Sequence, residues 1–216
     1  TAGVDTTATS GTTLAGTLAT SDSALDLGAV TLAADGTLRS GSGTITVGSV
    51  DGGSTHGLTL QADAAGSTGS VTLTGPLTAK SLTTFDTNAS YGLSLLGGGT
   101  IQEATTLRSS ALTLGDEATD TFDFVGGLST SILTGNFINL AGTVRTAGNA
   151  LTLGDADSLL YLRGDTVLTT GTGGGTITLD GAANYGHGLT ITAGSGDIVL
   201  ATATGATAPL ARLTAS

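Results

Sequence analysis

The aspartates that could bind a metal ion gather in two short stretches of the chain. Five of them are candidate calcium ligands: Asp116, Asp120, Asp123, Asp155 and Asp157. Calcium takes six to eight oxygen ligands, most often from closely spaced aspartates together with backbone carbonyls. The calcium-binding nonapeptide Gly-Gly-x-Gly-x-Asp is absent, and residues 194–198 only echo it. We therefore interpret these aspartates as solvated turn residues, with structural Ca²⁺ as the alternative, and expect no other cofactor.

Catalysis would need a unique constellation of side chains, and the sequence offers none. His56 and His187 each precede a glycine at equivalent positions of a repeat, which predicts structural corner residues rather than catalytic or metal-binding ones. A polysaccharide-cleaving β-helix would bring carboxylates, basic residues and aromatic platforms together in a groove. Glu103 and Glu117 are the only glutamates, Lys80 is the only lysine, and tryptophan is absent. We predict that the chain is not an enzyme.

The tripeptide Arg163-Gly164-Asp165 is the one that integrin ligands present at a loop tip. The residues on either side, Tyr161-Leu162 and Val167-Leu168, have the pattern of strands. We therefore predict that the tripeptide is a turn between two short strands.

The composition is that of an all-β protein with a thin core. The 216 residues include 36 Gly, 2 Pro and no Cys, Met or Trp, with 38% hydrophobic and 11% charged residues. The hydrophobic share argues against disorder, and the many β-branched residues favour strands. A formal net charge of −11 with six scattered basic residues excludes a nucleic-acid-binding patch. No apolar run reaches the roughly 18 to 20 residues that span a bilayer, and no signal peptide is visible, so we expect a processed chain or an excised segment.

Two stretches, residues 43–83 and 175–214, repeat one pattern, with Gly43 corresponding to Gly175. Each has Gly-Thr-Ile-Thr, then His-Gly-Leu-Thr, then a third apolar strand and a Pro-Leu pair. Apolar and polar residues alternate within each unit, which is typical of a strand with one buried and one solvated face. The strands are about three to five residues long and recur about every 10 residues, so three of them would make a coil of about 20 to 30 residues.

The alternating strands predict a fold and a core. The side chains predicted to face the core are Ile45, Val47, Leu58, Leu60, Val71, Leu73, Leu93, Leu95, Leu112, Leu114, Leu151, Leu153, Ile177, Leu179, Leu189, Ile191, Ile198 and Leu200. Most breaks are loose Gly-, Ser- and Thr-rich corners rather than Asn-Gly or Asp-Gly hairpin turns, which disfavours the alternative of an antiparallel sandwich array. We predict an all-β fold, a parallel β-helix (β-solenoid) forming a single elongated rod over residues 1–216. The least regular part is 117–148, and we assign its Phe122, Phe124 and Phe137 to the core or to a wider coil.

Thr-x-Thr pairs such as Thr44/Thr46 and Thr176/Thr178 could belong to a flat ice-binding surface. Such a surface needs threonine on one face in nearly every coil. The strands Leu93–Leu95 and Leu112–Leu114 interrupt the rank, so we interpret the threonines as ordinary solvated strand residues.

Three segments, residues 175–179, 188–200 and 204–214, read GTITL, GLTITAGSGDIVL and TGATAPLARLT. This succession resembles the repeats of giant bacterial surface proteins related to filamentous haemagglutinin and to autotransporter passengers, and the resemblance runs fairly continuously over residues 43–214. It implies a right-handed parallel β-helix that is secreted to the bacterial cell surface. It also implies a role in display, adhesion or fibre formation. The chain shows no recognisable secretion domain of that family.

Our hypothesis from the sequence is a non-catalytic, structural and adhesive segment of a secreted bacterial surface fibre. The expected partners are copies of itself or flanking repeats of a longer chain, joined end to end into a filament, and a host or neighbouring-cell surface. The alternative is a ligand- or glycan-binding adhesin module, for which residues 117–148 are the candidate region. A polysaccharide-active β-helix enzyme and an ice-binding face are the remaining alternatives.

Overall fold

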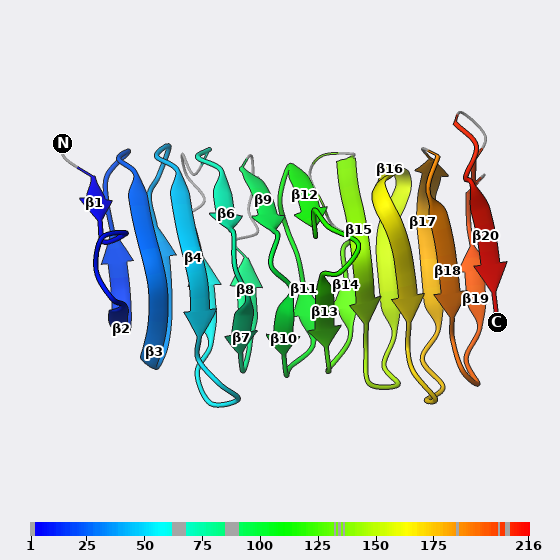
Figure 1. The fold of residues 1–216 in the computed structure, drawn as a ribbon, viewed down its shortest axis with the longest axis horizontal. Helices are drawn as coiled ribbons and strands as arrows, with labels where there is room; N and C mark the ends of the chain where they lie inside the picture. Colours follow the sequence, from blue (N-terminus) through cyan, green and yellow to red (C-terminus); the bar gives the residue numbers. More distant parts are fainter. Residues whose placement is uncertain are drawn as a thin grey trace.

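The chain winds into a parallel β-solenoid whose coils stack along one axis, with the N- and C-terminal ends at opposite ends of the stack (Figure 1). The computed structural model describes residues 3–61, 68–84, 91–131, 133, 135, 137–184, 186–202, 204–205 and 208–216. Within these residues the regular elements are strands throughout, with no helix.

The strands are short where a corner interrupts the backbone ladder and long where the ladder continues around a corner. In chain order they are β1 (Val4–Asp5), β2 (Thr12–Ala19), β3 (Leu25–Arg39), β4 (Ile45–Asp51), β5 (Leu58–Leu60), β6 (Val71–Leu73), β7 (Leu77–Ala79), β8 (Leu82–Thr84), β9 (Gly92–Leu95), β10 (Gly99–Ile101), β11 (Thr105–Thr106), β12 (Ala111–Leu114), β13 (Thr121–Phe124), β14 (Leu128–Ser129), β15 (Phe137–Arg145), β16 (Leu151–Thr169), β17 (Ile177–Asn184), β18 (Gly188–Thr192), β19 (Ile198–Leu200) and β20 (Arg212–Ala215).

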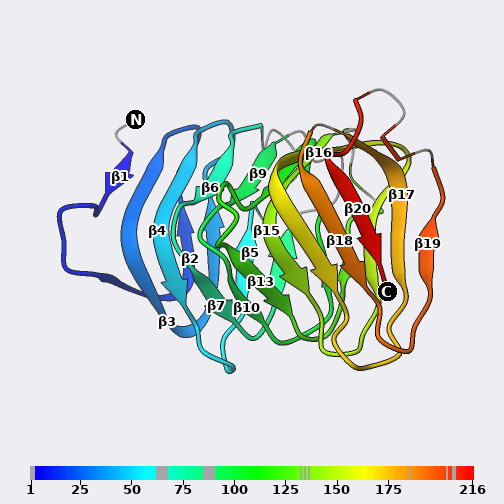
Figure 2. The same cartoon turned by 45° about the vertical axis from the view of Figure 1, so that its right-hand side comes forward.

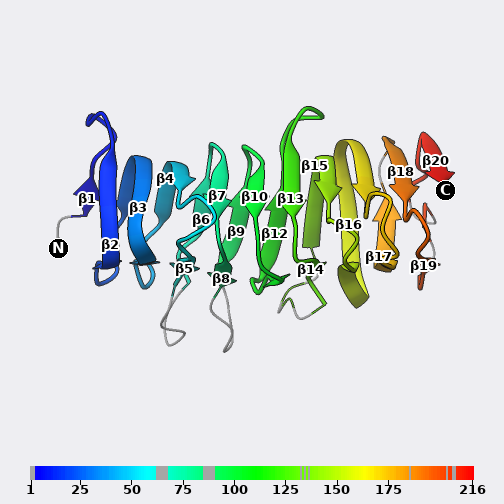
Figure 3. The same cartoon turned by 90° about the horizontal axis from the view of Figure 1, so that it is seen from below.

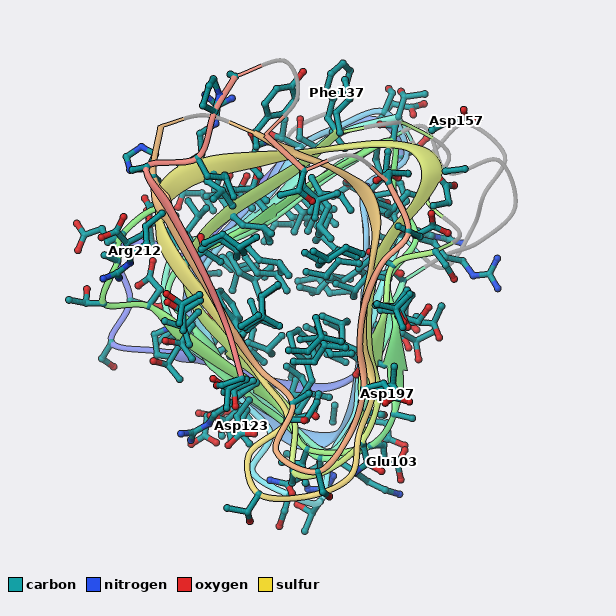
Figure 4. The ribbon with its side chains drawn as sticks, turned by 90° about the vertical axis from the view of Figure 1, so that its right-hand side faces the viewer. Glu103, Asp123, Phe137, Asp157, Asp197 and Arg212 are labelled. Carbon is teal, nitrogen blue, oxygen red and sulfur yellow. The ribbon has the colours of Figure 1, made fainter. Side chains whose placement is uncertain are left out.

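Each coil has three sides, which we name faces A, B and C in the order in which the chain visits them; the end-on view shows the three-sided section (Figure 4). Face A is the column of paired residues Val4, Leu25, Ile45, Val71, Leu93, Leu112, Ile138 and Leu160. Face B is the column Thr12, Val30, Val50, Leu77, Gly99, Phe122, Val144, Leu168, Ile191 and Ala215. Face C is the column Gly36, Leu58, Leu82, Thr105, Leu128, Leu151, Ile177 and Ile198, in which β8 contacts β11 and the other neighbours pair as ladders.

Every strand pairing in the described part of the chain is parallel and joins one coil to the next, as the turned view shows (Figure 2). The length of a turn varies along the stack. On face B, Thr12 pairs with Val30, whereas Val50 pairs with Leu77, which is further from it along the chain. The chain makes about 9 turns, which follow one another from the N- to the C-terminal end (Figure 3). The predicted parallel β-solenoid is confirmed and the antiparallel sandwich is excluded, while right-handedness stays a prediction.

The interior is one column of aliphatic side chains with a few aromatic ones, and the end-on view shows mostly carbon inside and oxygen outside (Figure 4). Of the side chains predicted to face the core, those from Ile45 to Ile191 are all buried. The two on β19 differ, because Ile198 is only partly buried and Leu200 is 40% exposed. Both keep the inward register, since Ile198 pairs with the buried Ile177 and Leu200 with the buried Leu179. They are exposed because β19 is the last described strand of face C, so no further described rung covers them.

The sequence repeat does not follow the period of the coil. Ile45 lies on face A, whereas its counterpart in the second stretch, Ile177, lies on face C. Leu58 lies on face C and its counterpart Leu189 on face B. The repeat therefore falls one face short of a whole number of turns, which is possible because the three faces use the same strand pattern with one buried side.

Replacing Leu73 by alanine tests the packing of this column. Leu73 is buried in the centre of the stack, so its truncation should lower the free energy of unfolding by about 2–5 kcal/mol through lost burial and the cavity left behind. The neighbouring Thr72 points outward, and Thr72→Ala should change stability by less than about 0.5 kcal/mol. Urea unfolding of the two variants measures this difference, and equal losses would contradict the assignment of the two sides of β6.

Candidate functional site

An exposed aromatic side chain on face A marks the most distinctive part of the outer surface. In β15, Ile138 and Leu140 point into the core, so Phe137 and Asn139 point outward. Phe137 is 47% exposed, whereas Phe122 and Phe124 are buried. The assignment of Phe137 to the core is therefore wrong. The alternation from Phe137 to Leu140 places it outside.

Four side chains from two neighbouring coils form the aromatic–arginine patch: Phe137, Asn139, Tyr161 and Arg163. Phe137 and Tyr161 stack with ring centroids 5.7 Å apart and planes 18° from parallel. The Arg163 guanidinium carbon lies 5.8 Å from the Tyr161 ring centroid, and its Nε donates a 2.8 Å hydrogen bond to Asn139 Oδ1. Together the four side chains line a shallow hollow. Figure 4 shows Phe137 projecting outward from its side of the coil.

Among the residues that the structure describes, the surface next to Phe137 is open and polar on the side of the preceding coils. Phe137 pairs with Ala111, and Ala111 pairs with Gly92, so the two preceding rungs carry almost no side chain at this column. A Cβ atom built on Gly92 would meet nothing within 4 Å. The adjacent outward column holds Thr113, whose Oγ1 accepts a 3.3 Å hydrogen bond from Asn139 Nδ2. A flat floor with hydroxyl and amide groups along one side therefore extends from the aromatic pair.

The Arg163-Gly164-Asp165 tripeptide lies within β16, at the bend from face A to face B, rather than in a turn between two strands. The prediction of a separate turn is wrong because β16 stays paired to β15 and β17 on one side of the bend and to β15 and β18 on the other. Both charged side chains are engaged within the solenoid. Arg163 bonds Asn139, and Asp165 Oδ1 accepts a 2.7 Å hydrogen bond from the Gly188 backbone N–H.

The two histidines occupy matching corners, although these corners lie on different faces. Gly57, which follows His56, donates its N–H to Asp35 Oδ1 at 2.8 Å, as Gly188 after His187 does to Asp165. The carbonyl of each histidine accepts a backbone hydrogen bond from the next coil, from Lys80 N–H at 2.8 Å and from Ala211 N–H at 3.0 Å. A carboxylate from one coil, a glycine N–H and a histidine carbonyl thus link three successive coils, as a structural role requires.

The candidate calcium ligands serve turns and a surface ion pair instead of converging on one point. Asp120 Oδ2 accepts hydrogen bonds from the N–H groups of Asp116 and Glu117. Asp155 Oδ1 accepts bonds from the Asp157 N–H and the Ser158 hydroxyl, and Asp123 pairs with Arg145 at 3.0 Å. Among the residues that the structure describes, no three His, Cys, Asp or Glu side chains form a group that could hold a metal ion.

Face C carries a rank of outward hydroxyl groups that the spacing of residues along the sequence does not reveal. The rank consists of Thr17, Thr37, Thr59, Thr83, Thr106, Ser129, Thr152 and Thr178, and it ends at Val199. The strands Leu93–Leu95 and Leu112–Leu114 lie on face A, so they do not interrupt this rank. The argument from these strands against a threonine rank is therefore wrong for face C, because the face on which a strand lies depends on how many residues each preceding turn contains.

Comparisons with known proteins give this chain no relative. No family model, curated protein or solved structure matches it. The β-solenoid fold is shown by the strand pairing, and the resemblance to filamentous-haemagglutinin repeats stays an interpretation of the sequence. In the described part of the chain, no helix is long and apolar enough to cross a bilayer.

The corner at Asp22 makes stability depend on pH. Its Oδ1 accepts hydrogen bonds from the backbone N–H and the hydroxyl of Ser42 in the next coil, at 2.9 and 3.0 Å, and the backbone bond is the main cause of a lowered Asp22 pKa. Because the folded state holds this carboxylate ionised, its stabilisation is complete well above about pH 4 and is lost as the pH falls through the lowered pKa.

We therefore expect Asp22→Ala to be less stable than the wild type at pH 7, with a difference that shrinks as the pH falls below about 4. Ser42→Ala keeps the backbone N–H, so it should retain most of the pH dependence. Urea unfolding between neutral and acidic pH measures both effects. A difference between wild type and Asp22→Ala that grows on acidification would contradict the role given to this carboxylate.

Proposed function

We propose that the chain is a non-catalytic length of rod in a secreted bacterial surface fibre, of the kind that its sequence resembles. The observation that carries the proposal is the stack itself, in which the described coils use the same parallel pairing around one aliphatic column. Such a solenoid grows in length without needing a larger core, because each coil contacts only its neighbours. We further propose that the coil is right-handed.

End-to-end contact is part of this proposal. The last described rungs leave two inward apolar side chains exposed, Leu200 at 40% and Leu213 at 45%. Leu213 pairs with the buried Leu189, so it belongs to an inward column. Another coil of the same kind, from the same chain or from a second copy, would bury these side chains and pair the open backbone edge.

Electron microscopy of the purified chain tests the rod. Rods should appear whose length is about 43 Å or a multiple of it, from about 9 turns at about 4.8 Å per turn. Leu213→Lys places a charge in the inward column of the last rung and should abolish the longer particles. The control Thr214→Lys alters the outward neighbour in the same strand and should leave them unchanged. Compact, isometric particles would overturn the proposal.

Ice binding is the second candidate function, and the hydroxyl rank of face C is the observation that favours it. The rank places a threonine or serine on eight consecutive rungs, spaced about 4.8 Å apart where the rungs pair in the backbone ladder. Between Thr83 and Thr106 the described strands β8 and β11 are in contact without pairing as a ladder. Beside it lie the small residues Ala104, Gly127 and Ala150, which with part of the rank line a shallow trough. A rigid, uncharged array of hydroxyl and methyl groups is suited to hold an ordered layer of water.

This candidate predicts that the wild type inhibits ice recrystallisation and that Thr106→Lys and Thr152→Lys abolish the inhibition, because a long charged side chain disrupts the flat array. Thr100→Lys alters an outward residue of face B and serves as the matched control, with activity retained. Microscopy of annealed ice grains gives the measurement. A wild-type chain without effect at millimolar concentration would eliminate ice binding.

A further inference from the structure

We propose that the aromatic–arginine patch binds an acidic saccharide, through a pyranose ring next to Phe137 and a carboxylate on Arg163. This inference goes beyond the rod function, since it assigns a ligand to one place on the outer surface of face A. It stands on the geometry of Phe137, Asn139, Tyr161 and Arg163, and on the open floor formed by Ala111 and Gly92.

The aromatic pair is the first reason. Tyr91, Phe122 and Phe124 are buried, whereas Phe137 and Tyr161 both point outward and stack on neighbouring coils. The Phe137 ring is half exposed even though one of its sides is covered by Tyr161. An aromatic face carries negative charge density, which attracts the weakly positive C–H groups on the apolar face of a pyranose. An exposed ring beside an empty floor is therefore a platform for a sugar.

Arg163 is the second reason, because it is a positioned cation without a carboxylate partner in the described part of the chain. Within the described residues, Lys80 pairs with Glu103 at 3.5 Å and Arg145 with Asp123, but Arg163 makes no ion pair. Asn139 and the Tyr161 ring hold its side chain in place, which leaves the end of the guanidinium fork for a planar anion. In a chain of net charge −11, a held and unneutralised arginine points to an acidic group on the ligand.

The space beside the pair sets the size of the ligand. As far as the described residues go, Ala111 and Gly92 leave the column open over two rungs, or about 10 Å at about 4.8 Å per rung. This length fits one or two pyranose rings. The side chains of Asn139, Thr113 and Ser94, in successive register along the neighbouring column, offer hydrogen-bonding groups for sugar hydroxyls. A protein partner would need an interface of at least about 1,000 Å², far more than these few side chains supply. The net charge of −11 also disfavours a long polyanion, so we assign a short saccharide.

Isothermal titration with two probes, trigalacturonic acid and the neutral galactose trisaccharide, tests the proposal. We expect the acidic probe to bind at least tenfold more tightly than the neutral one, and to bind less tightly as salt increases. Phe137→Ala should weaken binding of both probes at least tenfold. Arg163→Gln, which keeps a donor for Asn139, should reduce the affinity for the acidic probe to that for the neutral one.

Two matched controls separate the site from a general effect of charge or apolar surface. Arg145→Gln removes a cation from face B, and Val199→Ala truncates an exposed apolar side chain on face C, so both should bind like the wild type. Far-ultraviolet circular dichroism checks that each variant keeps the fold, as expected for exposed side chains. No binding of either probe, equal binding of the two, or an equal loss in Arg145→Gln would each overturn the proposal. None of these results bears on rod formation.

Discussion

The parallel hydrogen-bond ladder between successive coils is the constraint on which the rest of the structure depends. Each rung is paired in register with the rung before and after it, so an inward position in one coil fixes an inward position in the next. The column Ile45, Val71, Leu93 is apolar, since a polar side chain in such a column needs a buried hydrogen-bond partner, as Thr105 of face C has in the Glu103 carbonyl. Where no described rung follows, as at Leu200, the same kind of column is open to solvent.

The fold and most of the core were predictable from the sequence, because a two-residue alternation identifies the buried side of a strand wherever the strand lies in the coil. The patch was not. Phe137 stands in a stretch with a poor repeat, and we assigned it to the core with Phe122 and Phe124, although the alternation Phe137-Ile138-Asn139-Leu140 already indicated that it points outward. Its stacking on Tyr161 depends on the register that pairs Asn139 with Tyr161 in the next coil, which no local pattern reveals.

The face of the solenoid on which each strand lies was the other feature that the sequence did not reveal. Residues 43–83 recur in sequence at 175–214, yet this recurrence relates face A to face C and face C to face B. The corners explain why such a shift is tolerated. Asp35 with Gly57 and Asp165 with Gly188 make the same bond between coils at corners that lead into different faces. A strand and its corner thus form a local unit that fits any of the three faces. Sequence similarity between two such units therefore does not show that they lie on the same face.

The same constraint makes the outward side chains of the rod largely independent of its stability. Once Ile138 and Leu140 occupy the core, the residues between and beside them are free of any packing requirement from within. Their positions are nevertheless rigid, because the ladder fixes the spacing of neighbouring rungs. On face C the outward positions carry a rank of hydroxyl groups, and on face A they carry an aromatic pair beside the small residues Ala111 and Gly92. A solenoid can therefore change what its surface recognises, one rung at a time, without changing how it folds.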